Sequence, residues 1–214
     1  MGSRAVLFDF DGTLADTAAD LVSALNRLRA ARGLAALPLS ELRPYASAGA
    51  RGLIVAGFGI LAEHPEFKTM REAFLKYYAD AICVETKLFP GMDELLIAIE
   101  ARGLRWGIVT NKSTSLTKKL VADLGLDGRA ACVVCGDTTP HLKPHPASLL
   151  HAAQVLRLAP QECLYLGDDL RDILAAHAAG MSSVAVEWGY GGDDIPSWNA
   201  DRVIAKPTDL IASL

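Results

Sequence analysis

The sequence has no long apolar run and no excess of basic residues. Its 214 residues include 21 Lys and Arg against 25 Asp and Glu, which gives a formal net charge of −4. A chain with this balance lacks the positive field that attracts nucleic acid or an anionic membrane. Apolar stretches end well before the roughly 18 residues of a membrane-spanning helix, and no basic region followed by an apolar run opens the chain. We therefore expect a cytoplasmic protein that binds neither nucleic acid nor membrane.

Cysteine is scarce, and its placement indicates reduced thiols. The four cysteines, Cys83, Cys132, Cys135 and Cys163, lie mostly in apolar runs. Cys132 and Cys135 have C-x-x-C spacing, but redox pairs of that kind sit at a helix N-terminus. The two valines between them are typical of a buried parallel strand. We expect core cysteines of a reducing compartment here, and no redox site.

What the sequence does have is an alternation of short apolar runs with helical stretches. The runs are rich in β-branched residues and are followed by Gly, Asp, Asn or Thr; they span residues 5–8, 105–109, 131–135, 163–166 and 183–186. Such runs fit strands buried on both faces of a parallel sheet. The helical stretches between them span residues 93–102, 113–124, 147–156 and 171–179. The alternation predicts an α/β fold with a doubly wound parallel sheet.

One part of the chain breaks this alternation. From residue 16 to about residue 87 the sequence shows helical periodicity and no strand, with helices expected over residues 18–32, 39–45 and 66–84. We predict a smaller all-helical domain of residues 16–87, inserted after the first strand, and a core domain of residues 1–15 and 88–214. Helices inserted at that point would cover the end of the first strand, exclude water and select the substrate.

Two carboxylates follow the first strand directly. Asp9 and Asp11 come after the apolar residues 5–8, and Gly12 then breaks the strand. In an open parallel sheet, ligands bind outside the carboxyl ends of the strands. Two buried like charges this close together are unfavourable unless a cation or a shared proton offsets them. Asp9 and Asp11 are therefore candidates for a small-molecule site.

Four segments resemble the motifs of the haloacid dehalogenase-like hydrolases, in the order of that family. Asp9 to Thr13 read Asp-Phe-Asp-Gly-Thr, which is similar to the first motif, Asp-x-Asp-Gly-Thr. Residues 108–112 resemble the second motif, a strand that ends in Thr or Ser. Residues 143–146 read Lys-Pro-His-Pro like the third motif, and residues 164–169 end in Gly-Asp-Asp like the fourth. The resemblance spans essentially the whole chain and implies a Rossmann-like core with a helical cap.

The resemblance implies a role for each matched side chain. Asp9 would be the nucleophile that forms an aspartyl-phosphate. Asp11 would be the general acid and base, which protonates the leaving oxygen and later takes a proton from the attacking water. Lys143 would place a positive charge beside the equatorial oxygens of the transferred phosphoryl group. Thr13 is expected to serve the turn by hydrogen bonding to backbone.

The negative charge of these carboxylates and of a phosphate ester calls for a cation, and oxygen ligands are what Mg²⁺ prefers. We expect Asp9, the backbone carbonyl of Asp11, and Asp168 to hold Mg²⁺. Asp169 is expected to orient water or Lys143 from just outside this set. Asp172 is an alternative for the same supporting role, and the sequence does not choose between Asp169 and Asp172.

The residues that would bind the substrate are expected in two places. Thr110 and Asn111, at a strand end that opens a helix, can offer a hydroxyl and backbone N–H groups to the phosphate. Lys112, the next residue, is expected to face solvent. Arg51 lies in residues 47–52, which are expected to form a small, glycine-containing loop between helices. It is either a bidentate ligand for a substrate carboxylate or a surface arginine, and the sequence favours neither.

The resemblance also implies a reaction class. Asp11 argues against carbon–halogen cleavage, because the dehalogenases of the family lack the second aspartate in this form. The chain is most similar to the phosphoglycolate phosphatases with a helical cap, which implies Mg²⁺-dependent hydrolysis of a small phosphorylated metabolite, 2-phosphoglycolate. The alternatives are hydrolysis of N-acetylmuramic acid 6-phosphate, a β-phosphoglucomutase-like mutase, and a catalytically silent relative that binds a metabolite. The sequence leaves open whether the chain is a monomer or a homodimer.

Overall fold

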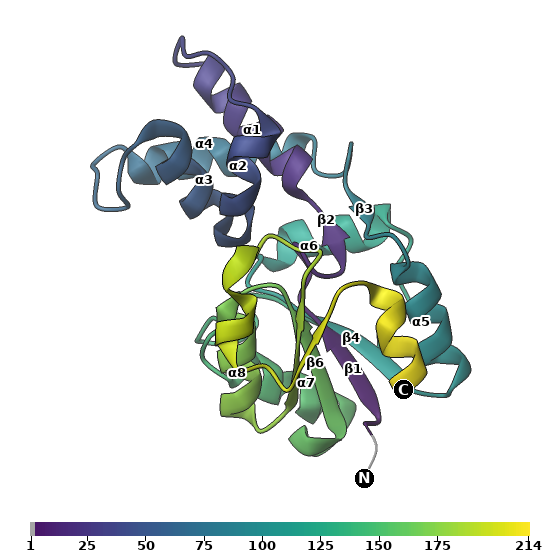
Figure 1. Cartoon of the computed structure of the whole chain (residues 1–214). Helices are drawn as coiled ribbons and strands as arrows, with labels where there is room; N and C mark the ends of the chain where they lie inside the picture. Colours follow the sequence, from purple (N-terminus) through teal and green to yellow (C-terminus); the bar gives the residue numbers. More distant parts are fainter. Residues whose placement is uncertain (1–2) are drawn as a thin grey trace.

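Parallel strands form the centre of the molecule. The computed structural model describes residues 3–214, so the first two residues of the predicted core domain lie outside it. Its main sheet has six parallel strands in the order β5-β4-β1-β6-β7-β8 (Figure 1). Their bounds are Ala5–Phe8 for β1, Arg105–Val109 for β4, Cys132–Val134 for β5, Cys163–Gly167 for β6, Ser182–Val186 for β7 and Arg202–Ile204 for β8. The five predicted strands are confirmed, and β8 is a sixth that was too short and too exposed for the sequence to indicate.

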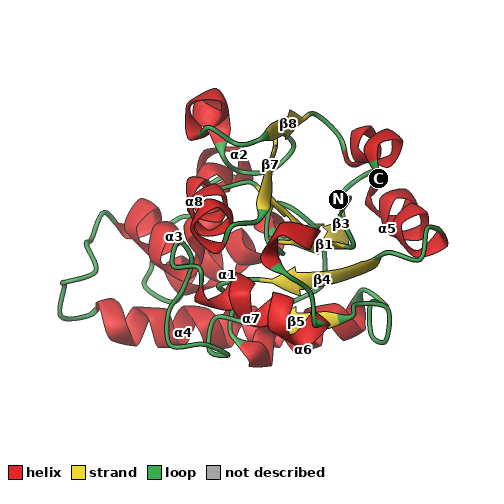
Figure 2. Cartoon of the chain, turned by 90° about the horizontal axis from the view of Figure 1, so that it is seen from below, coloured by secondary structure: helices red, strands yellow, loops and turns green. Residues whose placement is uncertain are grey.

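Helices cover both faces of this sheet, as the predicted fold class requires. They are α5 (Met92–Ala101), α6 (Thr114–Asp123), α7 (Ala147–Leu156) and α8 (Leu170–Ala179). Val6 and Phe8 of β1 pack in one buried cluster with residues of α5 and α6. Ala5 and Leu7 point to the other face and pack with α7 and α8. Figure 2 shows α5 and α8 on opposite sides of the strands. The sheet is therefore doubly wound, with β1 buried on both faces.

Residues 16–87, called the helical unit below, stand apart from the sheet (Figure 1). They contain α1 (Ala18–Ala30), α2 (Leu39–Leu42), a 3-10 helix (Arg43–Ala48), α3 (Gly49–Phe58) and α4 (Phe67–Asp80). Apolar side chains of α1, α3 and α4, including Leu25, Leu53 and Phe74, are fully buried between these helices. The predicted loop at residues 47–52 is wrong, because the end of the 3-10 helix runs there directly into the first turn of α3.

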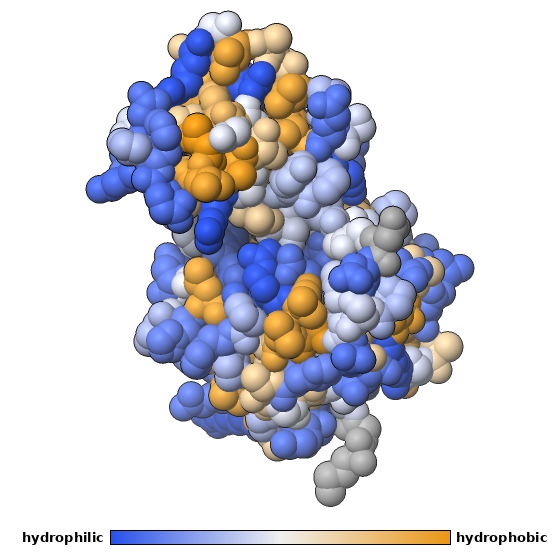
Figure 3. Space-filling model, turned by 60° about the vertical axis from the view of Figure 1, so that its left-hand side comes forward, coloured by the Kyte–Doolittle hydropathy of each residue, from blue (hydrophilic) through white to orange (hydrophobic). Residues whose placement is uncertain are grey.

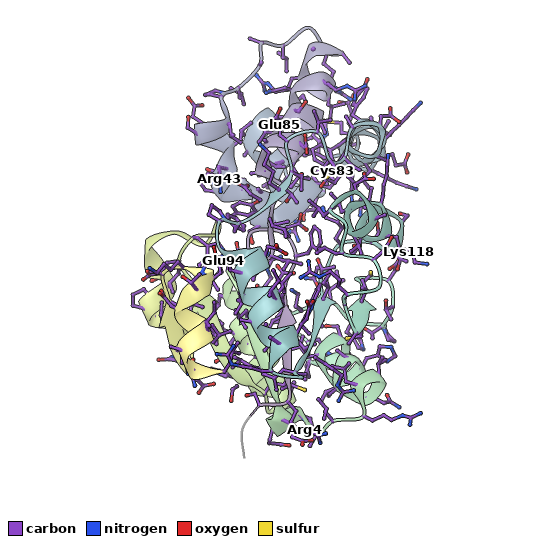
Figure 4. The ribbon with its side chains drawn as sticks, turned by 90° about the vertical axis from the view of Figure 1, so that its right-hand side faces the viewer. Arg4, Arg43, Cys83, Glu85, Glu94 and Lys118 are labelled. Atoms are coloured by element: carbon purple, nitrogen blue, oxygen red, sulfur yellow. The ribbon has the colours of Figure 1, made fainter. Side chains whose placement is uncertain are left out.

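Two short strands join the helical unit to the sheet, although no strand was expected at this boundary. β2 (Ala15–Asp16) pairs antiparallel with β3 (Lys87–Leu88), so the outgoing and returning chain lie side by side. Two residues per strand are too few to show the alternation by which a strand is recognised. Figure 4 shows Cys83 and Glu85 in the segment that returns from α4 to β3.

The structure agrees with the expectation of unpaired cysteines and of helices too short to cross a membrane. All four cysteines are free, and Cys132 and Cys135 lie within and just after the buried strand β5. Burial raises the pKa of Cys132 to about 12, so its thiol stays protonated. Within residues 3–214, no helix is long and apolar enough to cross a membrane.

A buried carboxylate fixes the returning segment, and its removal is a first test. Asp20 of α1 is 3% exposed and accepts hydrogen bonds from the N–H groups of Val84, Glu85 and Thr86 and from the Thr86 hydroxyl. Asp20→Asn turns an N–H₂ group toward these donors, so we expect the free energy of unfolding to fall by about 2 kcal/mol. Urea denaturation measures this, with the exposed Asp80→Asn as control. A loss equal to that of the control would contradict the anchoring role.

Candidate active site

The carboxyl ends of the three central strands bring the predicted residues together. Asp9 follows β1, Thr110 follows β4, and Asp168 follows β6. β1 lies between β4 and β6, with Phe8 opposite Ile108 on one side and Leu166 on the other. Because parallel strands end at the same edge, residues separated by up to 159 positions in the sequence meet there.

Three carboxylates form a tight cluster at this edge. One oxygen each of Asp9, Asp168 and Asp172 lie within 4.8 Å of one another. Burial, the charge of Asp172 and the charge of Asp11 raise the pKa of Asp9 to about 7, against the lowering effect of Lys143. Burial and the neighbouring charges of Asp9 and Asp172 also raise the pKa of Asp168 well above its ordinary value. Three negative charges this close are therefore unfavourable without a compensating cation.

The donor set of the cluster fits a hard divalent cation. It offers carboxylate oxygens alone, which suits Mg²⁺ and not a soft metal. Two of the three predicted ligands, Asp9 and Asp168, belong to the cluster. The side chain of Asp11 pairs with Lys112 and does not belong to the cluster. Its backbone carbonyl remains a predicted ligand. Asp172, expected only in a supporting role, is the third member.

Lys143 supplies the positive charge inside the cluster. Its Nζ lies 2.8 Å from Oδ1 of Asp9 and 2.6 Å from Oδ1 of Asp172, and it donates to the Tyr165 hydroxyl at 2.7 Å and to the carbonyl of Val109. Burial alone would lower the pKa of Lys143, but Asp172 and Asp9 raise it above its ordinary value. Lys143 therefore remains an ammonium although its side chain is only 3% exposed.

Asp172, not Asp169, is the partner of Lys143. The expected contact between Asp169 and Lys143 is wrong, because the Asp169 carboxylate caps α8 and binds Arg171 at 2.8 Å. Asp169 also accepts a hydrogen bond from Ser47 of the helical unit at 2.7 Å. Burial would raise the pKa of Asp169, but these partners hold it at about 2. Asp169 thus joins the sheet to the helical unit.

Backbone and side-chain donors fix Asp168. Its Oδ1 accepts from the Thr13 hydroxyl at 3.0 Å, and its Oδ2 accepts from the Tyr190 N–H at 2.8 Å. Gly12 has φ +85°, and a Cβ there would lie 2.1 Å from Oδ2 of Asp168. Only glycine therefore allows this approach. The backbone hydrogen bond expected for Thr13 is corrected, because its hydroxyl donates to the Asp168 carboxylate.

Lys112 faces the site, which corrects the expectation that it faces solvent. Its Nζ lies 2.9 Å from Oδ1 of Asp11, and its side chain is 8% exposed. Oδ1 of Asp11 also accepts a hydrogen bond from the Thr17 hydroxyl at 2.5 Å. Lys112 in turn donates to the hydroxyl of Tyr78, which lies in α4 of the helical unit. The sequence could not predict that Lys112 turns inward to pair with Asp11, because the two residues lie 101 positions apart.

Thr110 and Asn111 lie at the site, with different parts available to a ligand. The Asn111 amide is used twice by the backbone of Lys143, once as acceptor at 2.9 Å and once as donor at 3.1 Å. This side chain positions Lys143, and the backbone N–H of Asn111 is the group expected to bind a phosphate. Thr110 lines the cavity, and its hydroxyl accepts from the Lys112 N–H at 3.2 Å, so its proton remains free to be donated.

A cavity of about 580 Å³ lies between the sheet edge and the helical unit. Its lining includes Asp9, Asp11 and Lys143 from the sheet side, and Arg51 and Phe74 from the helical unit. In the space-filling view the boundary between the two parts is hollowed and hydrophilic (Figure 3). Arg51 lies in the first turn of α3 and is exposed, and no side-chain ion pair to it occurs among residues 3–214. Both interpretations of Arg51 therefore stay open.

Two tyrosines of the site were missed by sequence reasoning. Tyr165 lies in the middle of β6, within an apolar run that predicts a core position. Its hydroxyl nevertheless contacts Lys143, Asp172 and the carbonyl of Val109. Tyr190 belongs to none of the four motifs, yet its hydroxyl donates to Asp16 and accepts from the Thr17 N–H. Only the return of the chain after β7 brings Tyr190 to this position.

Comparison with known proteins agrees with this geometry. A family profile described as haloacid dehalogenase-like hydrolase matches residues 6–186. The chain belongs to the haloacid dehalogenase-like hydrolases. A phosphoglycolate phosphatase of Xanthomonas campestris is 44% identical over 209 residues, which cover 97% of this chain and 94% of that protein. The N-acetylmuramic acid 6-phosphate phosphatase of Pseudomonas aeruginosa is 40% identical over 213 residues, 99% of this chain and 94% of that protein.

Solved structures extend the comparison to the fold of this family. A crystal structure described as a predicted phosphoglycolate phosphatase from Haemophilus somnus superimposes with a TM-score of 0.88 at 27% identity, covering 99% of this chain and 97% of that chain. The predicted family and fold are thereby confirmed. The chain is a hydrolase whose relatives are phosphatases, and phosphatases of this family are generally metal-dependent.

The carboxylate cluster makes stability depend on pH when metal is absent. The folded protein keeps the Asp9 proton up to a pKa of about 7, whereas an unfolded chain loses it near pH 4. Between these values the folded state binds more protons than the unfolded state, so the free energy of unfolding falls as pH rises. Asp9→Asn removes this loss, and in chelator we expect its melting temperature to exceed that of the wild type by roughly 10 °C at pH 8.

The two ends of the pH range provide the control. At pH 4 the folded wild type carries the proton on Asp9, so the two melting temperatures should nearly coincide. Added Mg²⁺ should stabilise the wild type more than Asp9→Asn at pH 8, because the variant lacks one ligand charge. A difference between the two proteins that is equal at pH 4 and pH 8 would contradict the raised pKa of Asp9.

Proposed function

We propose that this protein is a Mg²⁺-dependent phosphatase that hydrolyses a small phosphate monoester through an aspartyl-phosphate on Asp9. The observation that supports this most is the placement of the Asp9 carboxylate. It lies 2.8 Å from the Lys143 ammonium, within the carboxylate cluster and at the wall of a cavity. A nucleophile, a positive charge for the phosphoryl oxygens and oxygen ligands for a cation thus meet at one point.

The proposed reaction has two steps, each with its proton accounted for. In the first, an oxygen of Asp9 attacks phosphorus, the bond from phosphorus to the ester oxygen breaks, and Asp11 gives its proton to that leaving oxygen. In the second, water attacks the same phosphorus, and Asp11 takes the proton of that water. The bond between Asp9 and phosphorus then breaks, which releases inorganic phosphate and restores Asp9 as a carboxylate and Asp11 as the protonated acid.

The remaining residues are assigned to binding and orientation. Lys143 neutralises charge on the phosphoryl oxygens, and Thr110 and the Asn111 N–H bind them. Asp9, Asp168 and the carbonyl of Asp11 are the proposed Mg²⁺ ligands, with Asp172 close enough to join them or to hold Lys143. The bound cation would offset the charges of the carboxylates and the ester and would polarise a phosphoryl oxygen as a Lewis acid.

We assign the helical unit, residues 16–87, as a cap domain over the core of residues 1–15 and 88–214. It contributes Arg51 and Phe74 to the cavity wall and touches the sheet edge through Ser47. A unit in this position excludes water from the aspartyl-phosphate and contacts the part of the substrate that lies beyond the phosphate. The free cysteines support a place in the reducing cytoplasm.

Two substrates are proposed, each an acid with a phosphate ester. 2-Phosphoglycolate is favoured by the relative of greater identity, and N-acetylmuramic acid 6-phosphate by the size of the cavity. Cavities of about 300–1,000 Å³ hold ligands of drug size, and 580 Å³ falls in that range. A two-carbon acid would fill only a small part of this volume unless the helical unit moves closer.

Phosphate release from a substrate panel tests the proposed function. The panel contains both proposed substrates, hexose phosphates and nucleoside monophosphates, each with Mg²⁺ and with Asp9→Asn as the blank. We expect one carboxylated substrate to have a kcat/KM far above the others, and loss of Asp9 to abolish release. No release above the blank would favour a silent relative, and movement of phosphate between hexose positions without release would favour a mutase.

Arg51→Ala tests how the carboxylate of the substrate is recognised. If Arg51 binds that carboxylate, the variant should raise KM for the carboxylated substrate about tenfold and leave p-nitrophenyl phosphate nearly unchanged. Arg71→Ala is the matched control, because Arg71 is a second exposed arginine of the helical unit at the cavity. Equal effects of Arg51→Ala on both substrates would remove Arg51 from carboxylate recognition.

A further inference from the structure

We propose that Lys112 and Tyr78 are positioning residues that fix which oxygen of Asp11 carries the transferred proton, and that Tyr78 makes this arrangement depend on the seating of the helical unit. The inference rests on the proposed phosphatase reaction, in which Asp11 is the general acid and base. Neither residue touches the reacting atoms; both act through Asp11.

The two oxygens of Asp11 have different surroundings. Oδ1 accepts the Thr17 hydroxyl at 2.5 Å and lies 2.9 Å from Nζ of Lys112. Among residues 3–214, no side chain or N–H group pairs with Oδ2, and Asp11 lines the cavity. A proton on Oδ1 would lie beside the Lys112 ammonium and would compete with both donors for the lone pairs of that oxygen, so protonation there is unfavourable. A protonated Asp11 therefore favours its proton on Oδ2, which is free to face the substrate.

Lys112 can hold Oδ1 only while its own charge is compensated. A buried ammonium is costly unless it is paired and hydrogen-bonded. Besides Asp11, Lys112 donates to the Tyr78 hydroxyl at 3.1 Å, and its Nζ lies 4.6 Å from the centre of the Tyr78 ring. Burial raises the pKa of Tyr78 to about 12, so the hydroxyl stays neutral. The ring and the hydroxyl together stabilise the ammonium in place.

The two partners of Lys112 come from different parts of the molecule. Lys112 and Asp11 follow strands of the sheet, whereas Tyr78 lies near the end of α4 in the helical unit. If the helical unit moves away, Lys112 loses Tyr78 and gains water, and its hold on Oδ1 weakens. The acid is then correctly oriented only when the helical unit is seated and the substrate is enclosed.

A neighbouring contact offers a matched control. Lys119 of α6 donates to the carbonyl of Ala79 at 2.7 Å, so it also joins the sheet side to the end of α4. Lys119 is exposed and lies in none of the contacts made by Asp11. Lys119→Met therefore removes a lysine contact between the two parts without touching the proposed acid.

The leaving group distinguishes orientation of the acid from a structural effect. An alkyl phosphate releases an alkoxide, which needs the proton of Asp11, whereas p-nitrophenolate leaves without one. The value of kcat/KM depends only on the steps up to cleavage of the ester bond. It therefore does not report the later attack of water on the aspartyl-phosphate. A variant that misplaces the acid should lower kcat/KM for the alkyl ester and spare the aryl ester. A variant that weakens phosphate binding or folding lowers both.

The experiment compares the wild type with Lys112→Met, Lys112→Arg, Tyr78→Phe and Lys119→Met. Each is assayed with Mg²⁺ on p-nitrophenyl phosphate and on the better alkyl substrate of 2-phosphoglycolate and N-acetylmuramic acid 6-phosphate. We expect Lys112→Met to lower the alkyl-to-aryl ratio of kcat/KM about tenfold or more, and Lys112→Arg to recover part of it. Tyr78→Phe, which keeps the ring, should lower the ratio about threefold, and Lys119→Met should leave it unchanged.

Each other outcome has a defined meaning. Parallel losses on both esters in Lys112→Met and Tyr78→Phe, or no loss, would overturn the positioning role while the phosphatase function stands. A drop in the ratio with Lys119→Met would assign the effect to docking of the helical unit in general. If the wild type hydrolyses neither ester, the proposed function fails and this inference fails with it. Tyr78→Phe, a conservative change, keeps the test decisive even if Lys112→Met does not fold.

Discussion

The mutual repulsion of three buried carboxylates is the constraint on which the rest of the site depends. Asp9, Asp168 and Asp172 place an oxygen each within 4.8 Å of one another, and like charges at that distance in a poorly solvated place strongly disfavour ionisation. The chain offsets part of this charge with Lys143, which lies between Asp9 and Asp172. The remaining negative charge favours a divalent cation, which supports the proposed Mg²⁺ site.

The surrounding structure serves to hold these charges where they are unfavourable. Thr13 and the Tyr190 N–H fix Asp168, the Asn111 amide fixes the backbone of Lys143, and the Tyr165 hydroxyl accepts from its ammonium. Each of these groups comes from a strand of the sheet or from a loop that follows a strand. A rigid scaffold of this kind is what keeps a charged site from relaxing into a solvated one.

Several contacts between the helical unit and the sheet edge are polar and involve residues at or near the cavity. Ser47 binds Asp169, Tyr78 binds Lys112, and the Arg43 guanidinium lies 5.0 Å from the centre of the Tyr190 ring. Figure 4 places Arg43 at the boundary between the two parts. Polar contacts of this type exchange with water at low cost, so they suit a surface that must open to admit substrate and close again.

The sequence by itself determined five of the six strands of the main sheet, the four helices between them, the helical character of residues 16–87, and the placement of Asp9, Asp168 and Lys143 at one edge. These follow from local signals, because apolar runs, turn residues and motif spacing act over a few residues. Only the tertiary structure decided that Asp172 pairs with Lys143, that Lys112 turns inward to Asp11, and which contacts join the helical unit to the site. The sequence alone does not distinguish Asp169 from Asp172. In the structure Asp169 caps the N-terminus of α8, whereas Asp172, the third residue of that helix, faces the sheet. Tyr78 and Lys112 come from separate parts of the chain, so no local pattern carries their contact.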